Sequence, residues 1–177
     1  MIAVHVVQVS RHHEVGVVTV RHRFVHSEHP ARKPPPLEEV LAAGLSSAHS
    51  DAALAGSLPI VLHRNPTVNL DELCRLARFR GESQTLGFFL DLTDDLTGQR
   101  RFSAKAKTLR DRRVCRMRNV FSHDGRFGPF ERELAEINSP EVARRWHFLM
   151  NMSLESFRSY LRKGTERLVS SSSSPDR

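Results

Sequence analysis

The chain has 177 residues, of which 39% are hydrophobic and ten are phenylalanine, enough apolar surface for one domain with extensions. It carries 27 Lys or Arg against 20 Asp or Glu, and the formal net charge of +7 favours a polyanionic partner such as nucleic acid. No apolar run approaches the roughly 20 residues that cross a bilayer, and the apolar N-terminal stretch lacks the charge order of a signal peptide. We therefore expect a cytoplasmic protein without membrane contact.

Residues 1–36 are rich in Val and His and end in three prolines. Their partly alternating valines predict an irregular or β-hairpin-like N-terminal extension, separate from the folded core. It is either an accessory segment or sequence upstream of the true start. Six of the ten histidines lie in the first 29 residues, but in a strand-like context that does not place ligands on one helix face. No metal site and no cofactor are expected.

Residues 37–167 show helical patterns that predict an all-α, up-and-down bundle of four to five helices. The first helix follows Pro36 and has acidic residues in its first turn. The second begins after Asn69 as its cap and stops at Gly81, and the third is capped by Ser83 and closed by Gly98.

Two longer helices are predicted after residue 100. One covers 101–121, and the other opens with Ser139 as cap and Pro140 at its first position and ends at Gly164. We expect Tyr160, on the second of these helices, to be in the core. The Ser-rich segment 168–177 is predicted to be a disordered tail. The apolar faces of the two helices comprise Phe102, Ala106, Leu109, Met117, Val120 and Phe121, and Val142, Trp146, Leu149, Phe157, Tyr160 and Leu161.

The two cysteines, Cys74 and Cys115, lie far apart and match no metal-binding spacing. We expect two reduced thiols in the core of a cytosolic protein.

The stretch from Arg100 to Arg118 holds nine Lys or Arg and one acid, Asp111. A solvated helix face normally mixes both signs, so this one-sided run favours contacts with RNA phosphates. The sequence therefore predicts RNA-binding residues at Arg112, Arg113 and Arg116. The alternative is a basic helix with no partner.

The segment RNVFSH, residues 118–123, combines an arginine, an amide and a histidine. Arginine holds phosphate oxygens in a planar fork, and histidine titrates near neutrality and can act as base or acid. Arg118 and His123 would lie about 140° apart on an ideal helix, so they can meet only if the helix ends between them. Ser122, Asp124 and Gly125 predict that end.

This motif resembles the signature of HEPN domains: an arginine, a polar residue, and a histidine four to six positions after the arginine. The family consists of small α-helical bundles, commonly dimeric, and many members are metal-independent ribonucleases whose paired motifs meet across the dimer. The resemblance implies that Arg118 binds the scissile phosphate, that His123 is the general base or acid, and that Asn119 orients one of them. It also implies a homodimer, a toxin or defence role and an antitoxin partner, although Gly125 stands where such toxins often carry a tyrosine.

Two other interpretations stay open. The domain could be HEPN-like without catalysis, as a binding or dimerisation module, or it could be a basic helical nucleic-acid-binding protein that matches the motif by accident. The same pattern occurs at Arg21–His26, and Arg116 could replace Arg118 as the phosphate ligand. The pair His123–Asp124 also occurs in metal-dependent phosphohydrolases, but those sites need further His and Asp ligands.

Overall fold

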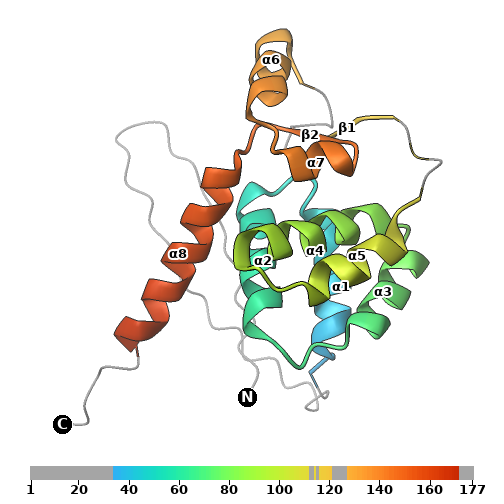
Figure 1. The fold of residues 1–177 in the computed structure, drawn as a ribbon, viewed down its shortest axis with the longest axis vertical. Coiled ribbons are helices and arrows are strands. Elements are labelled where there is room, and N and C mark those ends of the chain that lie inside the picture. Colours follow the sequence, from blue (N-terminus) through green and yellow to red (C-terminus); the bar gives the residue numbers. More distant parts are fainter. Residues whose placement is uncertain (1–33, 112–113, 115, 121–126, 172–177) are drawn as a thin grey trace, which may run out of the picture. The chain divides into compact units, whose positions relative to one another are not determined.

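The computed structural model describes residues 34–111, 114, 116–120 and 127–171, and from Pro36 onward they belong to one compact unit (Figure 1). In this part of the chain there are eight helices and one two-stranded sheet with three residues in each strand. The prediction of an all-α fold is confirmed, although the helices outnumber the four to five that were expected. No helix of the described part is long and apolar enough to cross a membrane.

Helix α4 (Ser83–Thr97) is the centre of this unit. It contacts α1 (Leu37–Ser47), α2 (Ala52–Arg64), α3 (Leu70–Phe79) and α5 (Arg101–Leu109). Every residue of α4 from 85 to 90 is buried, which is the pattern of a helix surrounded by protein rather than of one with a single apolar face. Helices α1, α2, α3 and α5 are therefore arranged as a shell around α4.

Several predicted helix ends are confirmed. The Asn69 side chain accepts hydrogen bonds of 3.1 Å from two backbone N–H groups of the first turn of α3. Gly98 closes α4 in the left-handed conformation, at φ 71°. Ser83, however, is the first residue of α4 and not its cap, since Glu82 occupies that position.

The predicted helix 101–121 is wrong beyond Leu109. The backbone becomes extended at Arg110, because the charged residues that follow offer no apolar side chain to continue the buried face. Residues Arg118–Val120 instead form strand β1, which pairs in parallel with β2 (Phe148–Met150). Met117, predicted to be apolar core, is exposed.

The predicted helix from Ser139 to Gly164 is also wrong, because it is three elements: α7 (Glu141–Arg145), strand β2 and α8 (Leu154–Ser171). Ser139 caps no helix start: its Oγ accepts from Met150 N at 2.8 Å and donates to Met150 O at 3.0 Å. All three residues of β2 are buried, which a surface helix could not achieve for consecutive positions. Helix α8 runs past Gly164, so the predicted tail begins as helix.

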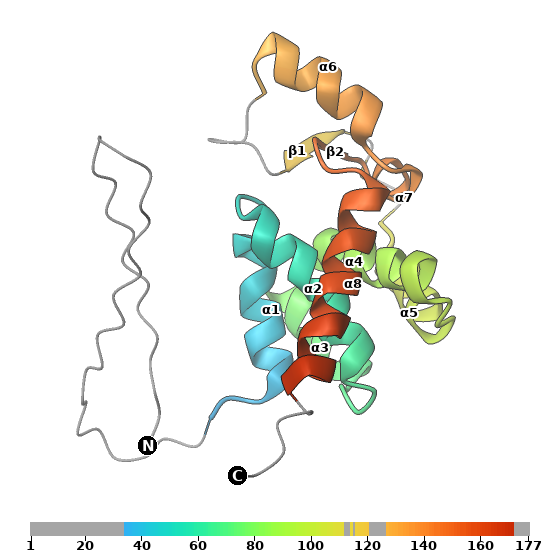
Figure 2. The same ribbon diagram turned by 90° about the vertical axis from the view of Figure 1, so that its left-hand side faces the viewer.

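Two helices, α2 and α6 (Pro129–Asn138), were not predicted. Helix α2 has a weak pattern because it holds Gly56 and Pro59 and buries both. Helix α6 has its N-terminal Pro but buries only Ala135, and Figure 2 shows it standing away from α1–α5. Helix α2 lacks the clear apolar stripe that identifies an amphipathic helix in a sequence, whereas α6 carries Phe130, Leu134 and Ile137 at helical spacing, a signal that the sequence analysis missed.

Two glycines allow the last helices to approach the bundle. The indole ring of Trp146, at the end of α7, lies against Gly87 of α4, and the ring of Tyr160 in α8 lies 2.7 Å from where a Gly56 side chain would begin. Tyr160 is nevertheless 38% exposed, so its prediction as a core residue is wrong. These two contacts connect α4 with α7 and α2 with α8.

Gly87→Ala should destabilise the fold, because the added methyl group would overlap the Trp146 ring and the core around it is closely packed. We expect a loss of about 1–3 kcal/mol in the free energy of unfolding, measured by urea denaturation. Gly44→Ala is the matched control, since its new Cβ would lie 4.0 Å from Leu54 and would improve helix propensity. Equal effects of the two substitutions would contradict the packing argument.

Candidate nucleic-acid interface

The described residues of the RNVFSH segment, Arg118–Val120, form a strand and not the end of a helix. Arg118 and Asn119 belong to strand β1, where Arg118 is opposite Phe148 and its backbone N–H donates to His147 O at 2.8 Å. The His147 carbonyl is available to β1 because His147 turns the chain between α7 and β2 with a left-handed backbone, at φ 57°. The first three residues of the motif are therefore held by a strand pairing, and the prediction of a helix that runs through Arg118 is wrong.

The described part of the motif is partly accessible. The side chain of Arg118 is exposed, Asn119 is half-buried, and Val120 is buried against the bundle. His123, which completes the predicted catalytic set, lies outside the described residues. Of the predicted RNA-binding residues, Arg116 is exposed, whereas Arg112 and Arg113 lie outside the described residues.

The solvent face of α5 carries one sign of charge. Arg100, Lys107 and Arg110 fall within about 80° of one another around the helix axis, and all are exposed. A different face of the helix buries Phe102, Ala106 and Leu109 against the bundle. None of the three cations forms an ion pair among the described residues.

The C-terminal end of α3 adjoins this face. The Arg78 guanidinium donates to the carbonyl of Thr108 at 3.2 Å, which brings the last turns of α3 and α5 together. Arg80, directly after α3, is exposed as well. We define the basic surface as the five exposed cations on these two elements: Arg78, Arg80, Arg100, Lys107 and Arg110.

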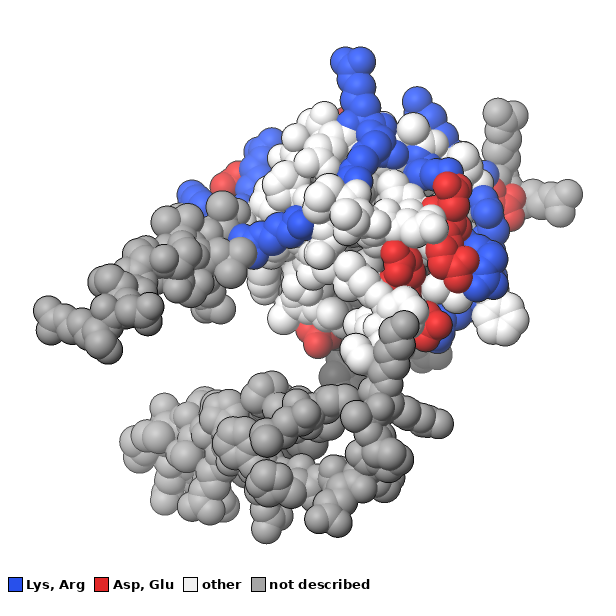
Figure 3. Space-filling model, turned by 90° about the horizontal axis from the view of Figure 1, so that it is seen from below, with Lys and Arg blue, Asp and Glu red and all other residues white. Residues whose placement is uncertain are grey.

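Other cations nearby are already occupied. Lys105 is ion-paired with Asp71, and Arg101 donates to the carbonyl of Pro66 at 2.6 Å while its guanidinium lies 4.4 Å from the centre of the Phe102 ring. These two side chains connect α5 to α3 and to the loop before α3. In the basic surface only Arg78 makes a comparable contact, with Thr108, and the other four cations face solvent. Figure 3 shows the uneven charge of one face of the molecule, where Lys and Arg spread along two edges and Asp and Glu form a smaller group beside them.

A second polar cluster, not found from the sequence, ties α1 to α4. The Glu82 carboxylate accepts hydrogen bonds from His49 Nε2 at 3.0 Å, Thr85 Oγ1 at 2.7 Å and Ser46 Oγ at 2.9 Å. These hydrogen bonds, that from His49 first, lower the pKa of Glu82 from 4.5 to about 2 against the opposing effect of burial. No sequence signal pointed to the cluster, because His49 and Glu82 are 33 positions apart.

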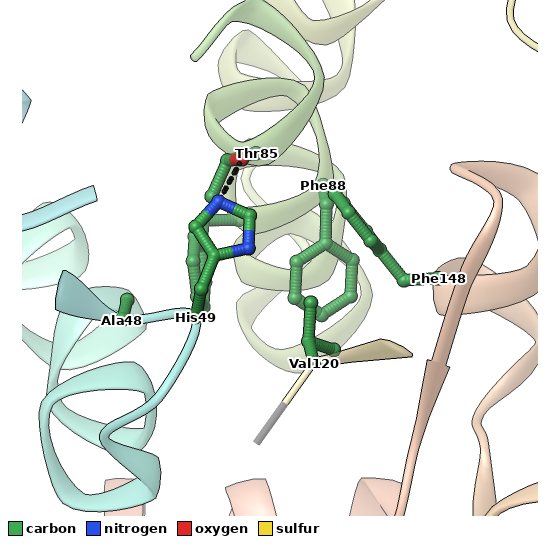
Figure 4. Close-up of a pocket in the computed structure, with 7 residues that line it drawn as sticks. Ala48, His49, Thr85, Phe88, Val120 and Phe148 are labelled. Carbon is green, nitrogen blue, oxygen red and sulfur yellow. Dashed lines mark hydrogen bonds between the residues drawn. The ribbon is translucent and has the colours of Figure 1, made fainter. Parts of the chain in front are cut away.

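A small pocket lies between this cluster and the strands (Figure 4). The His49 ring forms one wall, in an edge contact with Phe148 whose ring centroids are 6.1 Å apart. Val120 of β1 forms another wall, so the described part of the RNVFSH segment reaches the pocket. Apart from His49 and Thr85, the lining is apolar, and its members are Ala48, His49, Thr85, Phe88, Phe89, Val120 and Phe148.

The described residues contain no group of three or more His, Cys, Asp or Glu side chains arranged to hold a metal ion. Cys74 is buried and free, as predicted for a core thiol, and burial raises the pKa of its thiol. Cys115 lies outside the described residues.

Comparison of the chain with protein-family models, with curated proteins and with solved structures finds no match. The resemblance to HEPN domains therefore depends on the residues of the motif alone.

Glu82→Gln should destabilise the fold at neutral pH and weaken its response to acid. Because the folded-state pKa lies below the ordinary value, the carboxylate stabilises the fold above about pH 4.5, and this contribution is lost as the pH falls toward 2. The contribution is up to about 3 kcal/mol. The free energy of unfolding, measured between pH 7 and pH 2, should therefore fall less steeply with acid in the variant.

Glu72→Gln is the control for this experiment, because Glu72 is ion-paired with Arg75 on the surface, where such pairs contribute little. A wild-type acid response that survives Glu82→Gln unchanged would show that Glu82 does not anchor α1 to α4.

Proposed function

We propose that this chain binds RNA through the basic surface of α3 and α5. The observation that carries the proposal is a group of five exposed cations on adjoining elements, none with an ion-pair partner among the described residues. Folding alone does not account for them, since exposed cations of one sign repel one another and contribute nothing to the core. A polyphosphate backbone would neutralise them together.

The affinity of such a surface comes from the release of counterions from the nucleic acid. Each phosphate contact contributes a slope of about −0.7 in the dependence of log K on log salt for single strands, and about −0.9 for duplexes. RNA is preferred to an acidic protein as the partner because its backbone carries a negative charge at every nucleotide, so that one strand can neutralise several of these cations together. Four of the five cations are guanidinium groups, which hold phosphate oxygens in a planar fork.

The double substitution Lys107→Glu, Arg110→Glu should lower RNA affinity at least tenfold at low salt, because it replaces two phosphate contacts with repulsion. The salt slope of log K should flatten by about 1.4, which is two contacts at 0.7 each. Fluorescence anisotropy with a labelled RNA at several salt concentrations measures both quantities. Circular dichroism would verify that the fold is retained, as expected for exposed side chains.

The matched control is Arg132→Glu, Arg158→Glu, which reverses two exposed arginines on α6 and α8 that are paired with Glu136 and Glu155. It changes the net charge equally but leaves the basic surface intact. Equal losses in the two double variants would mean that overall charge, and not this surface, determines binding.

Cleavage of the bound RNA by the RNVFSH segment is a second candidate function. The observation in its favour is that the exposed Arg118 guanidinium has no ion-pair partner among the described residues and can hold a phosphate. In this proposal, which follows the HEPN resemblance, Arg118 stabilises the charge of the transition state, His123 moves the proton, and Asn119 orients one of them. A homodimer would then bring two motifs together, and a toxin role with an antitoxin partner belongs to the same proposal.

Arg118→Ala and His123→Ala should each abolish RNA cleavage, the first by removing the positive charge at the phosphate and the second by removing the acid or base. Cleavage by the wild type should persist in EDTA and leave 2′,3′-cyclic phosphate ends, detected by their resistance to labelling that requires a free 3′-hydroxyl. Arg21→Ala and His26→Ala, in the second match to the motif, are the controls and should leave cleavage unchanged. If the wild type binds RNA without cleaving it, the interpretation as a non-catalytic binding or dimerisation module remains. Cleavage that survives His123→Ala would exclude the proposed catalytic site.

A further inference from the structure

Phe79, the last residue of α3, is a large aromatic side chain that the fold does not bury. It is 86% exposed, more than any other large hydrophobic side chain in the described part of the chain. The buried face of α3 consists of Leu73, Cys74 and Ala77, and Phe79 projects roughly 170° from the middle of that face. Packing of the core therefore gives no reason for a phenylalanine at this position.

The backbone that carries Phe79 is well held. Arg80 N donates to Leu76 O at 3.0 Å, and Glu82 N donates to Ala77 O at 2.8 Å, which closes the helix end around Gly81 in the left-handed conformation. The next residue in the chain is the Glu82 whose carboxylate binds His49 and Thr85. The aromatic ring is thus presented from a fixed point, which limits the entropy lost when a ligand covers it.

The surroundings of Phe79 are positively charged. Arg78 and Arg80 flank it in the chain, and the hydrogen bond from Arg78 to Thr108 places the end of α5, which carries Lys107, next to the end of α3. The acidic residues of α3 are already paired, since Glu72 binds Arg75 through hydrogen bonds of 2.6 and 2.7 Å and Asp71 binds Lys105. An anionic ligand that reaches the ring therefore meets cations with no competing free carboxylate on α3.

We infer that the Phe79 ring is a stacking platform for an unpaired base, and that the basic surface around it selects single-stranded RNA over duplex RNA. The inference rests on the proposed RNA binding and adds the form of RNA that is recognised. An aromatic face beside a row of cations suits a single strand, because the base covers the ring while the adjoining phosphates reach the guanidinium groups. In a duplex the base faces are already covered by their neighbours, so the ring has nothing to stack on.

The test compares two labelled RNAs, a twelve-nucleotide unstructured strand and a blunt twelve-base-pair duplex, by fluorescence anisotropy. Phe79→Ala should weaken binding of the single strand about 5- to 100-fold, the effect of losing one stacked base, and should leave duplex binding within twofold of wild type. Phe79→Trp should restore single-strand affinity, since any large aromatic face can stack. The single-strand complex of Phe79→Trp should also show quenched tryptophan fluorescence.

Phe130→Ala is the matched control, because Phe130 is a 71% exposed phenylalanine on α6, where it is followed by Glu131. It should not change the affinity for either RNA. The Lys107→Glu, Arg110→Glu variant distinguishes a failure of the proposed RNA binding from a failure of the stacking inference, since it should weaken the binding of both RNAs. If that variant binds RNA like wild type, the proposal that the basic surface binds RNA is overturned. If it loses RNA binding while Phe79→Ala keeps full affinity for the single strand, the RNA-binding proposal stands and the stacking inference is overturned.

Discussion

The described fold depends on the burial of α4. A helix that buries six consecutive residues, from 85 to 90, must be covered on every side, and the surrounding helices supply that cover. The closest approach occurs where the Trp146 ring meets Gly87, and the Trp146 indole also donates to Asp91 of α4 at 3.0 Å. An interior of this kind is rigid, since few positions around α4 can move without opening a cavity.

The same arrangement explains where a nucleic-acid interface can be placed. Helices α3 and α5 each bury one face against the shell or against α4, and their remaining faces take no part in the core. Charges and an exposed aromatic side chain on these outer faces cost the fold little, because they stay hydrated. The basic surface and Phe79 are therefore features of the outer faces of two helices whose inner faces determine the stability of the domain.

Polar contacts on both sides of the small pocket hold elements that apolar packing alone would leave free to slide. On one side, Glu82 joins α1 to α4 through His49, Thr85 and Ser46. On the other side, the parallel pairing of β1 with β2 holds residues 118–120 against the pocket beside His49. The RNVFSH segment thus begins on a strand that is anchored by tertiary contacts, which differs from the helical context that its pattern indicated.

The sequence by itself determined the features that depend on neighbouring residues. Asn69 and Gly98 marked helix ends because side-chain capping and the left-handed conformation are properties of a few adjacent positions. The all-α class and the one-sided charge of 100–118 followed from composition and spacing in the same way. Tertiary structure alone decided the features that join distant residues. Strand β1 pairs with a strand 30 positions away, and Arg78 contacts Thr108 across the same separation. The Glu82 cluster joins residues 33 and 36 positions apart. The spacing of apolar residues in the sequence is helical through both strand segments. Their local preference for a helix is weak, however, and burying Val120 together with Phe148–Met150 stabilises the paired strands more.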